Sequence, residues 1–173
     1  IRMREEQRRA LRVPNTGMAV TIDIPGDDIH PPDKIPVGKR LAQLAFARTY
    51  GMDEVEGFGP IYRGHEIRGE AVHVEFDHAE TGLMVGEKAN LAPVEETNEP
   101  LKWFELAGAD GKWHPAEARI DGSSVAVRSE SVSSPQAVRY GCFTKPQGAN
   151  LYNRAGLPAS PFCSDLSFLP WEE

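Results

Sequence analysis

The stretch that decides the fold is residues 18–24, which read Met18-Ala19-Val20-Thr21-Ile22-Asp23-Ile24. The run is short, mostly apolar and rich in β-branched side chains, which is typical of a strand buried on both faces of a parallel sheet. A parallel strand needs a neighbour of the same kind, and the sequence offers none. The run therefore predicts the end of an α/β domain rather than a complete one.

Helices are predicted on both sides of this strand. The first precedes the turn at residues 14–17, and one of its faces gathers Met3, Gln7, Ala10 and Leu11. The second spans Pro36 to Tyr50, and its apolar face gathers Val37, Leu41, Leu44 and Ala45. We expect Asp33 to cap this second helix and Gly51 to follow its last turn. Residues 1–56 are thus predicted to be the closing segment of an α/β domain.

The hydrophobic pattern changes to a period of two after residue 57. Val72, Val74 and Phe76 alternate with polar residues, as in a half-buried strand. A hairpin is predicted around Asp121-Gly122, between alternating residues at 116–120 and 125–127. Short strands are also expected at 103–106 and 137–140. This spacing predicts a β-sandwich over residues 57–173, with an exposed irregular loop at 86–100 and an irregular tail after Pro146.

Composition restricts the classes of partner. Of the 173 residues 40% are hydrophobic, and the net charge of -7 argues against broad electrostatic binding to nucleic acid or anionic membranes. In this acidic chain, a solvated face is expected rather than an RNA contact for the arginines of the first helix, Arg2, Arg4, Arg8, Arg9 and Arg12. No apolar run approaches the roughly 20 residues that span a bilayer. Because the sequence begins at Ile1 and not at Met, we expect an upstream piece to be missing or cleaved.

The two cysteines, Cys142 and Cys163, allow two interpretations. They would form a disulfide in an oxidising compartment, or they are two unpaired thiols in a loop-rich region. No Cys-x-x-Cys motif or Cys/His cluster indicates zinc.

The stretch from Gly26 to Pro31 carries the candidate chemistry, because active sites of α/β folds lie at the carboxyl ends of parallel strands. His30 would take a proton from a nucleophilic hydroxyl and pass it to the leaving group. Asp27 or Asp28 would bind the other ring nitrogen and fix its tautomer. On spacing alone, a loop histidine beside surface aspartates is the simpler interpretation.

The wider motifs resemble the sialate O-acetylesterase family, whose catalytic domain is of the SGNH type. The closing segment of that domain is matched by Pro14-Asn15-Thr16-Gly17-Met18-Ala19-Val20, Asp28-Ile29-His30-Pro31, Pro36-Val37-Gly38 and Arg40-Leu41-Ala42. The family's C-terminal β-domain is matched by Gly59-Pro60-Ile61-Tyr62, Phe76-Asp77-His78, residues 104–110, Val138-Arg139-Tyr140, Asn150-Leu151-Tyr152-Asn153 and residues 156–162. The resemblance covers nearly all of the chain. It implies an α/β fragment, the end of an SGNH-type three-layer domain, followed by a β-sandwich.

The resemblance also implies an activity: hydrolysis of acetyl esters on sugar hydroxyls, as on sialate, with no metal or other cofactor. His30 falls on the catalytic histidine. Asp27 takes the general SGNH position and is slightly favoured over Asp28, which takes the Asp-Ile-His position. The family's nucleophilic serine and its oxyanion Gly and Asn have no match. We therefore expect this chain alone to be inactive, its partners to be an O-acetylated sugar and an absent N-terminal esterase segment, and its location to be secreted or periplasmic.

Other candidate residues have simpler interpretations. His73, Glu75 and Asp77 share one strand face and offer metal ligands, but exposed polar alternation explains them better. Trp103, Trp113 and Trp171 offer rings for sugar stacking, yet we expect Trp103 in the core and Trp113 in a loop or at an edge. Asn150 to Asn153 are expected to tie the tail down through backbone hydrogen bonds. The alternative function is a non-catalytic carbohydrate-binding or structural β-sandwich module.

Overall fold

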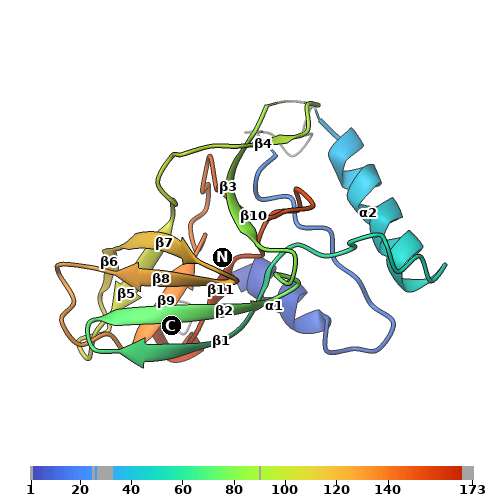
Figure 1. The fold of residues 1–173 in the computed structure, drawn as a ribbon. Coiled ribbons are helices and arrows are strands. Elements are labelled where there is room, and N and C mark those ends of the chain that lie inside the picture. The colour runs from blue at the N-terminus through green and yellow to red at the C-terminus, as the bar shows by residue number, and fades with distance from the viewer. Residues whose placement is uncertain (1, 25, 27–32, 90, 169–173) are drawn as a thin grey trace.

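The computed structural model describes residues 2–24, 26, 33–89 and 91–168, and most of these belong to a β-rich body (Figure 1). One sheet has the strand order β1-β2-β8-β7 (Ile61–Arg68, Ala71–Asp77, Ser124–Arg128, Glu117–Asp121). A second has the order β11-β9-β5-β6 (Phe162–Cys163, Ala137–Tyr140, Phe104–Ala107, Trp113–Pro115). A third has the order β10-β3-β4 (Leu151–Asn153, Leu83–Lys88, Val94–Glu96). Their strand pairs are antiparallel.

One hydrophobic core is shared by the sheets. Val74 on β2 and Val125 on β8 meet Leu106 on β5 and Val138 on β9, and all four side chains are fully buried. Leu151 of β10 adds a residue from the third sheet. The alternation of apolar and polar residues therefore turns one face of β2 and β8 inward, and the predicted β-rich character after residue 57 is confirmed.

The predicted hairpin at Asp121-Gly122 is also confirmed. Strands β7 and β8 pair antiparallel, with Asp121 opposite Ser124. Gly122 has φ 62°, which a glycine adopts without steric cost. The strands predicted at 103–106 and 137–140 appear as β5 and β9.

Residues 18–24 do not form the predicted strand; they run as irregular chain ending in a turn. A parallel strand is stable only beside another one, and the described chain has no parallel pair. Ile22 contacts the core, and a Cβ atom on Gly141 would lie 2.8 Å from the Cδ1 atom of Ile22.

Two regions predicted to be irregular contain strands. The loop at 86–100 includes the end of β3 and all of β4, with Gly86 opposite Glu96. The tail after Pro146 contains β10 and β11, which are buried. The partner of β10 is β3, about seventy residues earlier in the chain, so local pattern gave no sign of this pairing.

Both predicted helices are present, as α1 (Arg2–Ala10) and α2 (Ile35–Arg48). Their faces differ from prediction. In α1, Met3 is 71% exposed while Glu5 is buried, because Glu5 is paired with Arg8. In α2, Leu44 is buried, but Leu41 is 52% exposed.

The ends of α2 give a mixed result. Lys34, not Asp33, is the N-cap residue, and no side-chain hydrogen bond caps the helix. Gly51 has φ 67°, as expected after a last turn. Figure 1 shows α2 standing to one side of the strands. Within the described ranges, no helix is long and apolar enough to cross a membrane.

Candidate functional site

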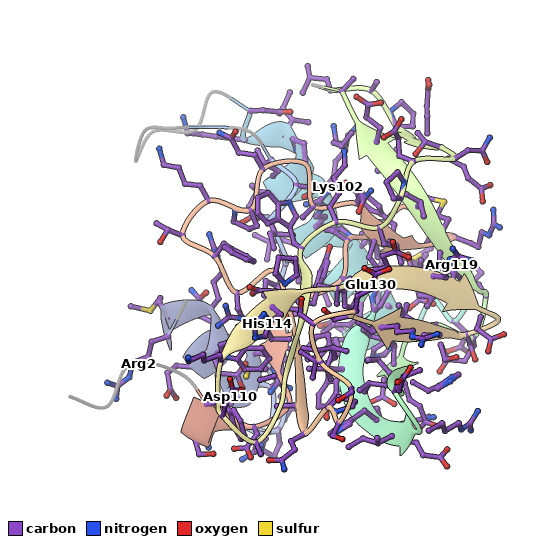
Figure 2. The ribbon with its side chains drawn as sticks, turned by 90° about the vertical axis from the view of Figure 1, so that its left-hand side faces the viewer. Arg2, Lys102, Asp110, His114, Arg119 and Glu130 are labelled. Carbon is purple, nitrogen blue, oxygen red and sulfur yellow. The ribbon has the colours of Figure 1, made fainter. Side chains whose placement is uncertain are left out.

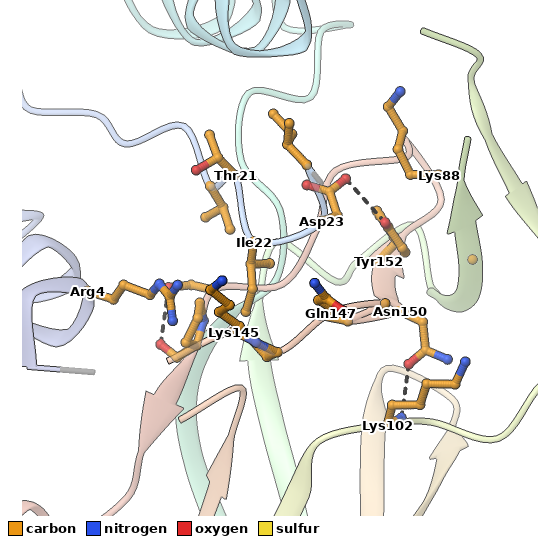
Figure 3. A pocket seen from close by; sticks show the side chains of 18 of the residues that line it. Arg4, Thr21, Ile22, Asp23, Lys88, Lys102, Lys145, Gln147, Asn150 and Tyr152 are labelled. Carbon is orange, nitrogen blue, oxygen red and sulfur yellow. Dashed lines mark hydrogen bonds between the residues drawn. The ribbon is translucent and has the colours of Figure 1, made fainter. Parts of the chain in front are cut away.

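A pocket of about 1040 Å³ lies where the N-terminal segment meets the β-rich body (Figure 3). One wall is formed by residues 17–24, which precede the candidate loop in sequence, and by Gly26 at the start of that loop. The others come from the end of β3 and from residues 144–150, before β10. The pocket thus adjoins the root of the loop that carries His30.

A buried ion pair lies at the root of this loop. Arg40 of α2 donates from Nη1 to Oδ1 of Asp23 at 2.7 Å and from Nη2 to Oδ2 at 2.6 Å. The same Nη1 donates to the carbonyl of Val20 at 2.6 Å. The side chains of Arg40 and Asp23 are only 6% and 1% exposed. A two-bond fork of this kind fixes the carboxylate in orientation as well as in position.

Tyr152 of β10 completes the network by donating from its hydroxyl to Oδ2 of Asp23 at 3.2 Å. Burial, and next the adjacent Asp23 carboxylate, raise the pKa of Tyr152 above its usual value. The tyrosine therefore stays protonated and remains a hydrogen-bond donor. Figure 3 shows Tyr152 directed at Asp23.

Two asparagines beside Tyr152 tie other segments to β10. Asn153 is fully buried; its Nδ2 donates to the carbonyls of Phe58 and His78, and its Oδ1 accepts from the amide of Leu157. Asn150 accepts from the amide of Lys102 and donates to the carbonyl of Pro100. The prediction that these asparagines tie down the tail is confirmed.

Charged side chains of both signs line the pocket. The cations are Arg4, Lys88, Lys102 and Lys145, and the carboxylates besides Asp23 are Glu87 and Glu99. Arg4 donates to the carbonyls of Phe143 and Thr144. Figure 2 shows the side of the molecule that carries Lys102, where Arg119, Glu130 and Asp110 add charges of both signs. Tyr152 contributes an aromatic ring to the lining, but that ring is 1% exposed.

The predicted catalytic residues Asp27, Asp28 and His30 lie outside the described residues. Ser160 lines the pocket, but it is buried and its hydroxyl donates to the carbonyl of Pro161. Over residues 2–24, 26, 33–89 and 91–168, no serine hydroxyl is hydrogen-bonded to a histidine.

Cys142 and Cys163 are buried free thiols that lie in one small cluster. Burial raises the pKa of Cys142 to about 12 and that of Cys163 to about 11. Thiols that resist ionisation are poor nucleophiles and poor metal ligands. Of the two interpretations left open by the sequence, the structure therefore shows unpaired thiols.

The other candidate residues have structural roles. Glu75 and Asp77 lie 3.2 Å and 3.8 Å from the guanidinium of Arg63, and the described residues contain no cluster that could hold a metal. Trp113 lies on the edge strand β6, with Arg139 stacked 4.4 Å from its ring. Trp103 is only partly buried, packs against the core and donates to the carbonyl of Gln147. Trp171 lies outside the described residues.

Comparison with known proteins finds three similar ones. No known family profile matches the chain. It is 29% identical to the sialate O-acetylesterase of Rattus norvegicus over 172 residues and 30% identical to that of Mus musculus over 173 residues. A carbohydrate acetylesterase from Xanthomonas citri, known from a crystal structure, is 40% identical with a TM-score of 0.80 over 92% of this chain. The chain is similar to sialate O-acetylesterases over most of its length.

The relationship to sialate O-acetylesterases extends over most of this chain but over a minor part of its relatives. The alignments cover 90% of this chain and 29% of each rodent protein. The structural match covers 34% of the Xanthomonas chain. The family resemblance read from the motifs is thus confirmed.

The hydrogen-bonded network of Asp23, Arg40 and Tyr152 in this relative of sialate O-acetylesterases was not predicted from the sequence. The sequence holds one local sign of this network, since Asp23 is the only charged residue in the mostly apolar run 18–24. A buried carboxylate needs a partner, but its cation is 17 residues away and its tyrosine 129 residues away. Sequence spacing gives no means of finding either.

Proposed function

We propose that this chain supplies the histidine and its orienting carboxylate to a serine esterase that removes O-acetyl groups from sugars. Its similarity to acetylesterases over most of its length is the observation that carries the proposal. The relatives are named as acetylesterases and align with 90% or more of the chain.

The proposed reaction is acyl transfer to serine and then to water. The serine attacks the acetyl carbonyl while His30 takes its proton and then protonates the departing sugar oxygen. Asp27 or Asp28 holds the other ring nitrogen and stabilises the imidazolium. The serine and the oxyanion donors belong to a segment outside residues 1–173, so the chain alone is inactive.

The pocket supports this proposal by its position. Residues 17–24 lead directly from its wall into the loop that bears His30, and the opposite wall presents polar side chains from the β-rich body. Lys102 and Gln147 are suited to sugar hydroxyls, which both donate and accept hydrogen bonds. Residues 57–173 would then serve as an accessory domain at the side of the catalytic centre.

Acetate release by the complete gene product tests the proposal. We expect the full-length protein to release acetate from an O-acetylated sugar and to be labelled by a fluorophosphonate on a serine outside residues 1–173. The isolated chain should do neither. A labelled serine within these residues, or a full-length protein that releases no acetate, would contradict the proposal.

A further inference from the structure

Residues 18–24, which lead into the loop bearing His30, are held by a small set of described contacts. Residues 18–24 have no strand neighbour, and within the turn at its end the amide of Ile24 donates to the carbonyl of Thr21. Ile22 packs on the β-rich body. Residues 18–24 are also held by Arg40, which donates hydrogen bonds to the Val20 carbonyl and to the Asp23 carboxylate.

Tyr152 links residues 18–24 to the β-rich body through its hydrogen bond to Asp23. Its ring packs against Gly86, where a Cβ atom would lie 3.0 Å from the ring. A phenylalanine would fill the same space. The hydroxyl needs its own explanation, because burying a hydroxyl is costly unless it is hydrogen-bonded. Its partner is Asp23, so this group connects β10 to the segment before the loop.

We propose that Asp23, Arg40 and Tyr152 form a positioning unit that fixes the root of the loop bearing His30 against the β-rich body. Asp23 lies four residues before Asp27 and seven before His30. Displacements of about 1 Å at a catalytic group can lower turnover about a hundredfold. The catalytic consequence rests on the proposed function, whereas the structural consequence does not.

The structural consequence is tested on the isolated chain by ¹⁵N relaxation. In the wild type, residues 20–24 should have order parameters near the rigid value of about 0.85. In Tyr152→Phe and in Arg40→Lys they should fall toward about 0.6, while those of β2 stay unchanged. Tyr62→Phe is the matched control, since it removes a hydroxyl that bonds His65 at 2.7 Å, away from this segment. Unchanged order parameters in both variants would overturn the proposal.

The catalytic consequence is tested on the full-length protein. Tyr152→Phe should lower kcat for acetate release roughly tenfold, the size of one lost hydrogen bond to a charged group. The KM should change little, because the reacting histidine is misplaced and the sugar contacts remain. Tyr62→Phe should keep the wild-type kcat. A wild-type kcat in Tyr152→Phe would overturn the positioning role and leave the esterase proposal standing. If the wild-type protein released no acetate, the esterase proposal would fail, and the relaxation experiment would still decide the anchoring.

Discussion

Arg40 and Asp23 form a buried two-bond fork, with donor–acceptor distances of 2.7 Å and 2.6 Å. Arg40→Leu would leave the Asp23 carboxylate buried without its counter-charge. We expect this change to lower the free energy of unfolding by about 3–5 kcal/mol, measured by urea denaturation.

The matched control for Arg40→Leu is Arg63→Leu, which removes an exposed pair with Glu75. That control should cost less than about 1 kcal/mol, because exposed ion pairs contribute little. Equal losses in the two variants would show that the Arg40–Asp23 pair is not buried as described.

Asn153 joins three parts of the chain through buried hydrogen bonds to Phe58, His78 and Leu157. Asn153→Ala removes these bonds and leaves their partners unsatisfied, so we expect a loss of about 3 kcal/mol, at roughly 1 kcal/mol per bond. Thermal unfolding followed by circular dichroism measures it. Asn98→Ala, at an exposed position, should stay within about 0.5 kcal/mol of the wild type. A loss that small in Asn153→Ala would refute this role.

Gly59 lies where two segments approach closely. A Cβ atom on it would lie 2.1 Å from the carbonyl oxygen of Pro158, so Gly59→Ala forces the backbone apart. We expect a loss of about 1–3 kcal/mol. Gly64→Ala is the control, since nothing lies within 4 Å of its added Cβ. Comparable urea midpoints for the two variants would argue against the contact between residues 59 and 158.

The buried thiols predict a dependence of stability on pH. The pKa values of Cys142 and Cys163 rise from 9.0 to about 12 and about 11, so the folded state keeps both protons longer than the unfolded state. This contribution is complete below pH 9 and is lost as the pH rises toward 11 and 12. Urea unfolding at pH 8 and pH 10 should show a decline that is smaller in Cys142→Ala. An equal decline in that variant would remove Cys142 as a cause.

The β-rich part was largely predictable because local pattern reports it. Val72, Val74 and Phe76 show the period of a strand with one buried face, and Asp121-Gly122 marks a tight hairpin. Residues 18–24 have the composition of a buried strand, but no composition supplies a hydrogen-bonding neighbour, so the strand prediction was wrong. The strands β3 and β10 were missed for the related reason that their pairing joins distant segments.

The candidate site was predictable only in part. The family resemblance drew attention to Asp27, Asp28 and His30, and their placement stays a prediction because they lie outside the described residues. The Asp23 network depends on contacts between residues 17 and 129 positions apart. Such contacts depend on how the folded chain packs, and the spacing of residues along the sequence does not reveal them.

The most direct test of the esterase account is acetate release by the full-length protein carrying His30→Ala. The account predicts that kcat/KM falls by at least about a hundredfold, because general acid–base catalysis typically contributes that much or more. His73→Ala, on the outer face of β2, should keep wild-type kcat/KM. A His30→Ala protein with near-normal acetate release would contradict the central claim that this histidine serves the reaction.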